Sequence, residues 1–247
     1  MFKIFDIIWS VVAAVEILLL SLIFVIIDFW LIFVPIKYRY RVARYVLIVP
    51  WCWTINTLFY FIRLKVIGKE YLDKNRTTMY ICNHQSWIDA STFGHITPAA
   101  ALAKSQVKNI PLVGFLVIYA GGILFDRDAQ SSRLGIVKLM MKTLKDGVSV
   151  CFFPEGTRSK DGNLLRPNLS LIKLAYKMKI PVVPAALNGT RDVVQKGRPY
   201  FRFFRKVVIK YNPPMNPADF PDDESFAAAC WGKVEETYGE ITKKVIS

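Results

Sequence analysis

From residue 64 onward, hydrophobic positions along the chain follow two alternating patterns. Short runs of β-branched and apolar residues predict buried strands, and longer stretches with apolar residues three or four positions apart predict helices. Residues 131–147, for example, carry apolar side chains at 134, 136, 137, 140, 141 and 144 before Gly147 ends the helical period. We expect strands at 64–68, 77–82, 98–104, 122–127, 148–153, 181–187 and 206–212, a turn and helix at 109–121, and helices at 131–147, 169–180 and 225–245.

Strands that alternate with helices predict an α/β fold with a mostly parallel sheet flanked by helices. In such a sheet, ligands bind outside the carboxyl ends of the strands. Polar motifs that directly follow the strands are therefore the first places to look for chemistry.

The N-terminal part has a different pattern, because residues 4–36 are almost uninterruptedly apolar. The run is too long for a cleaved signal peptide. Its stretch from Ile7 to Val34 would extend about 42 Å as a helix, which exceeds a hydrocarbon core of about 30 Å. A second apolar run, Tyr45 to Ile62, contains Pro50, two tryptophans and Asn56, a mixture typical of a membrane interface. We predict a membrane-associated helical hairpin at 1–63 and a catalytic domain at 64–247.

A basic cluster between the two apolar runs bears on orientation. If both runs crossed a bilayer, this cluster would lie inside and the remaining chain outside. Two arrangements keep the whole chain cytosolic: a hairpin within the cytosolic leaflet, or a spanning first helix followed by a surface helix. We expect the cytosolic face of a membrane (the inner membrane, if the source is bacterial), the alternative being a buried hairpin in a soluble protein. The cluster consists of Lys37, Arg39, Arg41 and Arg44.

Composition supports a membrane partner. The chain is 53% hydrophobic, yet its formal net charge is +14. A chain that is both hydrophobic and basic favours binding to anionic phospholipids over nucleic acid, so no nucleic-acid partner is expected. The four cysteines are widely spaced without CxxC or a histidine pair, which predicts no disulfide and no metal site, and suits a reducing compartment.

The motif NHQSWID, residues 83–89, follows the strand expected at 77–82. Ser86 is a candidate N-cap, which would place Asp89 in the third helical position. His84 would then lie on the strand-to-helix turn, where the Asp89 carboxylate can fix one imidazole nitrogen and leave the other free to take a proton. By itself a histidine near an acid is more often structural.

Two other strands end in cations. GGILFDR ends at Arg127, which could equally form a surface ion pair with Asp128. FPEGTRS, residues 153–159, combines Gly156, the Thr157 hydroxyl and the planar fork of Arg158, a combination suited to a phosphate. It is not a P-loop, and a plain turn with a solvated arginine is the alternative.

Together these blocks resemble the glycerolipid acyltransferase family, which includes the 1-acylglycerol-3-phosphate acyltransferases. NHQSWID matches the family's histidine-x4-aspartate block, GGILFDR its second block, FPEGTRS its third, and VVP within 180–187 its fourth. The match extends from about residue 64 to 212. The chain departs from common family residues at Gln106, Leu124 and Ser170, which leaves the chemistry intact.

The resemblance implies roles for individual residues. His84 would be the general base, oriented by Asp89, and the acceptor hydroxyl would attack the thioester directly. Ser86 as a nucleophile is the alternative. Glu155 would hydrogen-bond the glycerol or organise the arginines, and Pro184 would shape the pocket. The expected phosphate-binding residues are Arg127, Gly156, Thr157, Arg158 and Lys104.

The function implied is transfer of an acyl chain to the sn-2 hydroxyl of lysophosphatidic acid, giving phosphatidic acid in phospholipid synthesis. Acyl-CoA or acyl carrier protein would be the co-substrate, with no further cofactor. The alternatives are an acyltransferase or transacylase that acts on another lyso-phospholipid, and a membrane lipid-binding protein without catalysis. The paired His84 and Asp89 argue against the last, since a pure binder needs no base.

Overall fold

The structure is a computed structural model that describes residues 2–35, 38, 42–104, 109, 123–125, 130–198 and 200–246. The helix predicted at 109–121 lies outside the described residues except for residue 109, and so do Gln106 and Arg127.

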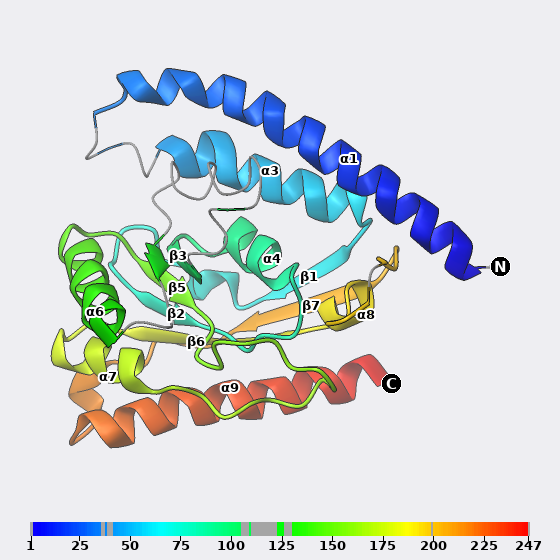
Figure 1. Cartoon of the computed structure of the whole chain (residues 1–247). Coiled ribbons are helices and arrows are strands. Elements are labelled where there is room, and N and C mark those ends of the chain that lie inside the picture. The colour runs from blue at the N-terminus through cyan, green and yellow to red at the C-terminus, as the bar shows by residue number, and fades with distance from the viewer. Residues whose placement is uncertain are drawn as a thin grey trace.

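A twisted sheet of seven strands forms the centre of the described part, in the order β1-β7-β6-β2-β5-β3-β4 (Figure 1). All neighbouring strands are parallel except β6 and β7, which are antiparallel. This confirms the predicted α/β class and its mostly parallel sheet. The strands are β1 (Arg63–Ile67), β2 (Met79–Ile81), β3 (Ala100–Lys104), β4 (Ile123–Phe125), β5 (Val150–Phe152), β6 (Val182–Asn188) and β7 (Lys206–Tyr211).

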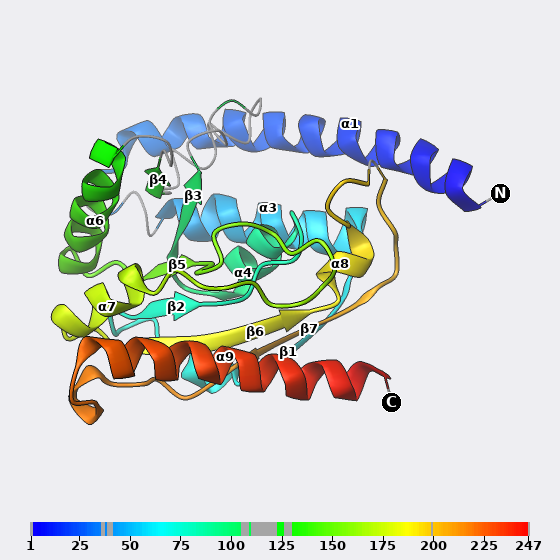
Figure 2. The same ribbon diagram turned by 60° about the horizontal axis from the view of Figure 1, so that its bottom comes forward.

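Each face of the sheet has its own hydrophobic core, because successive side chains of a strand point to opposite faces. In β2, Tyr80 joins one core while Met79 and Ile81 join the other. The first core lies under α3 (Val49–Thr54) and α4 (Asp89–Ile96). The second lies under the helices on the opposite face (Figures 1 and 2), namely α6 (Gln130–Lys145), α7 (Ser170–Lys177) and α9 (Asp223–Ile246).

The short segments complete the chain. The helix of the second apolar run is continuous and comprises η2 (Arg44–Ile48), α3 and η3 (Ile55–Phe59). A short turn, η4 (Lys69–Tyr71), follows β1, and α8 (Thr190–Val193) follows β6. Two further 3-10 turns among the described residues are η1 (Phe29–Phe33) and η6 (Pro217–Asp219).

The first apolar run forms α1 (Phe2–Asp28), which runs alongside α3 on its outer side (Figures 1 and 2). Small residues face the protein and allow close approach: Ser10 Oγ accepts the Phe201 N–H at 2.8 Å, and Ser21 Oγ accepts the Trp51 Nε1–H at 3.0 Å. Ala13 between them is buried. The helix is therefore docked at two points along its length.

The other face of α1 is apolar and exposed. By length and composition, the segment Ile7–Leu31 is the one described helix able to cross a membrane, and only 18% of its most hydrophobic window is buried. A buried core hairpin would hide these side chains, so their exposure on α1 argues against that alternative. The exposed residues include Ile8, Val11, Val15, Leu19, Leu22 and Ile26.

Candidate active site

His84 lies on the turn between β2 and α4, as predicted, and its imidazole is held by Asp89. His84 Nδ1 is 2.8 Å from Asp89 Oδ2, and the Asp89 side chain is fully buried. Asp89 Oδ2 also accepts two backbone N–H groups, so it serves as an acceptor toward the imidazole too, which places the hydrogen on Nδ1. The imidazole also stacks on Phe153, with ring centroids 4.2 Å apart. Among the described residues His84 Nε2 has no hydrogen-bond partner, and it is the nitrogen able to take a proton.

The predicted N-cap is wrong. Helix α4 begins at Asp89 itself, with Ile88 in the cap position and no capping side chain. The buried Ser86 hydroxyl instead donates to the Val194 carbonyl at 2.7 Å, just after α8. The turn is held from the helix side instead, because Asp89 Oδ2 accepts the N–H groups of Gln85 and Ser86 at 2.5 and 2.7 Å. A Ser86 hydroxyl that is buried and already donated is also poorly suited to act as a nucleophile.

The turn is fastened to its surroundings by two amide side chains. Asn83 is fully buried and exchanges two hydrogen bonds with the backbone of Leu187 in β6, at 2.8 and 2.9 Å. Gln85 Nε2 donates to the Tyr238 hydroxyl of α9 and to the Gly162 carbonyl. The loop that carries the imidazole is thus bound to the sheet on one side and to a helix on the other.

Glu155 connects the third motif to the first. Its Oε1 accepts the His84 N–H at 2.8 Å and its Oε2 accepts the Leu165 N–H at 2.9 Å. Burial raises the pKa of Glu155 to about 7, although these two N–H groups oppose the shift. Both oxygens bind backbone groups, so the geometry favours a positioning role over the predicted contact with glycerol.

The remainder of the third motif forms a turn next to this carboxylate. Gly156 adopts a φ of 61°, a conformation that glycine tolerates best. The Ser159 N–H donates to the His84 carbonyl at 3.0 Å. The two motifs, far apart in the sequence, are therefore joined by hydrogen bonds on both sides of His84.

Arg158 lies on the same edge, with its guanidinium carbon 4.3 Å above the Trp87 ring. Partial burial lowers the pKa of Arg158, while the charge of Asp89 opposes the shift. Within the described residues its guanidinium has no acidic partner, and its five N–H donors stay available for an anion. The exposed Trp87 is a contact that the sequence gave no reason to expect.

Lys196 is a second residue that the sequence analysis missed. Its ammonium donates to the Arg158 carbonyl at 2.9 Å and lies 3.3 Å from the Thr157 hydroxyl. It follows α8, at the same edge of the sheet as the motifs. The sequence could have pointed to Lys196 only through its position, because it follows the carboxyl end of the strand predicted at 181–187.

The other predicted residues are placed as follows. Pro184 is buried inside β6, paired with Ile81, and its carbonyl accepts the Asn212 N–H at 3.0 Å. Lys104 ends β3, but its side chain is not described. Arg127 lies outside the described residues. No group of three or more His, Cys, Asp and Glu suited to a metal is found in the described part of the chain.

Comparison with known proteins supplies the family. The sequence model of the family described as Acyltransferase matches residues 63–188, which covers both the His84 and the Glu155 motifs. The chain belongs to this acyltransferase family. The resemblance inferred from the motifs is confirmed.

Individual relatives carry a consistent name. The 1-acyl-sn-glycerol-3-phosphate acyltransferase of Limnanthes douglasii is 34% identical over 168 residues, 67% of this chain and 59% of that protein. The Escherichia coli K12 enzyme of the same name is 27% identical, with 68% of this chain and 69% of that protein aligned. The chain thus spans about 59% of the length of the first of these relatives.

A solved structure matches over nearly the whole chain. The crystal structure of the 1-acyl-sn-glycerophosphate (LPA) acyltransferase PlsC from Thermotoga maritima aligns with a TM-score of 0.82 and 27% identity. The alignment covers 98% of each chain, so it includes the N-terminal helices as well as the sheet.

Proposed function

We propose that this protein transfers an acyl chain from an acyl thioester to the sn-2 hydroxyl of 1-acylglycerol-3-phosphate, giving phosphatidic acid. The observation that carries the proposal is the buried Asp89 carboxylate 2.8 Å from His84 Nδ1, beside an arginine without an acidic partner among the described residues. The first arrangement supplies a base and the second a cation for phosphate. The printed names of the relatives support the same substrates.

The chemistry needs no enzyme nucleophile. His84 Nε2 takes the proton of the acceptor hydroxyl as its oxygen attacks the thioester carbonyl carbon. The carbon–sulfur bond then breaks, and the acyl chain stays on the oxygen as an ester. The imidazolium gives its proton to the departing thiolate, which leaves as a free thiol and restores neutral His84. Asp89 stabilises that imidazolium, and its own orientation is fixed by the two N–H groups of the turn.

The acceptor phosphate would bind at the edge formed by the third motif. Arg158 offers a fork of donors, and the Thr157 hydroxyl, placed by Lys196, offers another. The Gly156 backbone allows close approach. The family resemblance adds Arg127 and Lys104 to this site, and Pro184 would shape its wall from within β6.

The apolar face of α1 would keep the enzyme in the membrane that contains its acceptor. Burial of such a face in the acyl-chain region is favourable by about 25 cal/mol per Å² of apolar surface. The formal charge of +14 favours anionic lipids and an acidic acyl carrier. A lyso-lipid could then reach His84 laterally, without leaving the membrane.

The test is a substrate panel. Purified full-length protein should be incubated with lyso-phospholipids of different headgroups and with labelled acyl-CoA or acyl carrier protein. We expect labelled phosphatidic acid from lysophosphatidic acid, and a rate lower by about 10²–10⁴ with the His84→Ala variant. Transfer to another lyso-lipid at a higher kcat/KM, or from a diacyl phospholipid, would replace the proposed acceptor or donor.

A further inference from the structure

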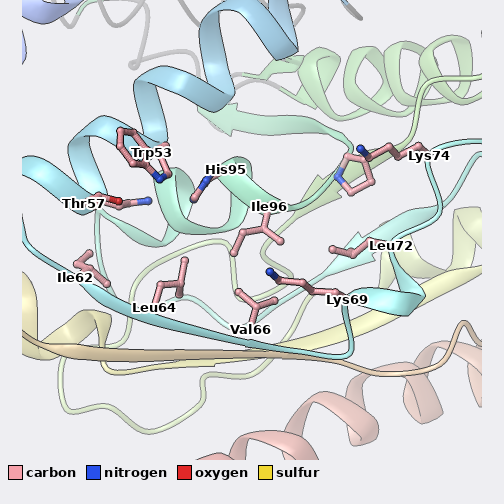
Figure 3. A pocket seen from close by; sticks show the side chains of 12 residues that line it. Trp53, Thr57, Ile62, Leu64, Val66, Lys69, Leu72, Lys74, His95 and Ile96 are labelled. Atoms are coloured by element: carbon pink, nitrogen blue, oxygen red, sulfur yellow. The ribbon is translucent and has the colours of Figure 1, made fainter.

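A cavity lies at the carboxyl end of α4, the other end of this helix from the His84 turn (Figure 3). It has a volume of about 570 Å³ and is formed by α3, the end of α4, β1 and η4. Binding cavities for small ligands are of this size. None of the residues that line it belongs to the proposed acyl-transfer site.

One wall of the cavity is apolar. Leu64 and Val66 point into it from β1, while Lys65 between them is exposed on the other side of the strand. Leu72 and Ile96 face them across the cavity (Figure 3). Such a surface suits a hydrocarbon chain rather than a sugar or a nucleotide.

The mouth of the cavity is cationic. Lys69 and Lys74 lie at its rim, His95 lies deeper, and none of the lining residues is acidic. In Figure 3 the Lys69 ammonium points inward, between Val66 and Ile96. No ion pair of Lys69 or Lys74 occurs in the described residues, and Lys74 is held over the Tyr45 ring at 5.4 Å.

Two buried nitrogen atoms at the cavity lack partners. Asn56 is 2% exposed, and while its Oδ1 accepts the Ser91 hydroxyl at 2.9 Å, its Nδ2 has no acceptor among the described residues. His95 Nδ1 is likewise buried and without a described partner. Buried polar atoms are normally satisfied, and an unsatisfied donor beside a cavity is an indication that a ligand supplies the acceptor.

The position of the cavity indicates the source of that ligand. Its upper wall is α3, which belongs to the membrane-associated hairpin, and Trp53 of this helix is exposed at the cavity. A molecule already in the bilayer could enter beside this tryptophan. A free phosphate ion would leave the apolar wall uncovered.

We propose that this cavity binds an anionic phospholipid of the surrounding bilayer, with its phosphate at Lys69 and Lys74 and an acyl chain along Ile62 and Leu64, on the side of the cavity away from the Lys69 ammonium. The proposal does not rest on the acyl-transfer reaction, since none of the residues that line the cavity takes part in the proposed acyl transfer. It would give the enzyme a fixed depth and orientation at an anionic membrane.

The experiment uses full-length protein in lipid nanodiscs with a photoactivatable phosphatidylglycerol, whose diazirine lies in one acyl chain. A phosphatidylcholine probe with the same chain serves as the zwitterionic comparison. Cross-linked peptides are mapped by mass spectrometry, so acyl-transfer activity is not part of the readout. We expect the anionic probe to label residues 62–72 and 95–98 well above the zwitterionic one.

The matched variants separate this site from general membrane contact. The double variant Lys69→Gln, Lys74→Gln should raise the probe concentration for half-maximal labelling about thirtyfold, because each of the two cations near an anionic surface contributes about 1 kcal/mol. Lys65→Gln, on the exposed side of β1, should leave it unchanged. All three lysines are exposed, so equal thermal unfolding midpoints would show that the folds are intact.

Three outcomes would overturn the proposal. Equal labelling by both probes would remove the anionic specificity. Labelling confined to α1 and the outer face of α3 would show that the cavity is not entered. Complete displacement of the anionic probe by excess inorganic phosphate would indicate a phosphate site without a lipid chain.

Discussion

His84 owes its orientation to a carboxylate oxygen that also accepts the N–H groups of Gln85 and Ser86. Three donors converge on Asp89 Oδ2, so the carboxylate cannot rotate without releasing the turn. His84 rests on Phe153 at the same time, which fixes the plane of its ring. The sequence spacing predicted the contact between His84 and Asp89, but not the two backbone donors that make it rigid.

The first prediction concerns this pair. His84→Ala should lower kcat by about 10²–10⁴, because it removes the base, while the protein stays folded and membrane-bound. Asp89→Asn should lose a large part of the activity, since an amide stabilises the imidazolium less. Steady-state kinetics with saturating lysophosphatidic acid measure both. Retention by His84→Ala of more than about a tenth of the activity would show that another group is the base.

The second prediction concerns Glu155, whose pKa is raised from its ordinary value of 4.5 to about 7 by burial. Because the folded state holds the proton more tightly than the unfolded chain, this group's contribution to stability is full below pH 4.5 and is lost as the pH rises through 7. As the pH is raised from 5.5 to 8, the thermal unfolding midpoint of the wild type should therefore decrease more steeply than that of the Glu155→Gln variant. Parallel curves for the two proteins would show that Glu155 does not titrate in this range.

The third prediction separates the acceptor from the donor. Arg158→Ala should raise the KM for lysophosphatidic acid much more than that for the acyl thioester, because a charge-assisted phosphate contact is lost. Arg158→Lys should rescue only partly, since an ammonium lacks the fork. We expect Arg127→Ala to behave like Arg158→Ala. If only the KM for the acyl thioester rose, Arg158 would be assigned to the donor instead of the acceptor.

Several residue-level features were beyond sequence reasoning, for physical reasons. Serine is a favourable N-cap residue, but the Ser86 hydroxyl donates its hydrogen bond to the Val194 carbonyl after α8, more than a hundred residues along the chain. The sequence leaves Glu155 to bind the glycerol or to organise the arginines, because its actual backbone partners, at His84 and Leu165, depend on how two loops fold together. Such long-range contacts leave no local pattern.

At the scale of elements, buried runs identified the strands well, because a strand covered on both faces is apolar throughout. In β2 and β5 every described residue is buried. Their order in the sheet and the antiparallel direction of β7 were not predicted, since pairing is set by packing between distant segments. Asn83 is an example: it ties the turn after β2 to β6, a neighbour that the sequence does not specify.

The fourth prediction tests that connection. Asn83→Ala leaves the Leu187 N–H and C=O buried without partners, at a cost of roughly 1–3 kcal/mol each. The variant should have a clearly lower free energy of unfolding and reduced kcat, since the His84 turn is no longer held. Urea unfolding measures the change, and Asn163→Ala, in an exposed loop, is the control. Equal stability of the two variants would mean that the turn is held by its other contacts.

At the scale of the whole molecule, the hairpin and the catalytic domain form one packed unit. The Asn56 side chain of η3 accepts a hydrogen bond from Ser91 in α4, and Cys52 and Ile55 of the same helix are buried. The second helix therefore cannot cross a bilayer without carrying the domain with it. Helix α1 contacts the rest of the protein at Ser10 and Ser21. If α1 crossed the bilayer, one of these two contacts would have to form inside the hydrocarbon region or on the far side of the membrane.

The last prediction follows from this docking: α1 lies within the cytosolic leaflet, and both its ends and the catalytic domain are on the cytosolic side. The four native cysteines are buried and can be replaced to give a background without thiols. Single cysteines are then introduced at three places: Lys3→Cys in the first turn of α1, Lys37→Cys in the basic cluster, and Asp146→Cys just after α6. In sealed right-side-out vesicles all three should resist an impermeant thiol reagent until detergent is added. Labelling of the Lys3→Cys protein from outside would show that α1 spans the bilayer, and labelling of the Asp146→Cys protein would place the catalytic domain outside.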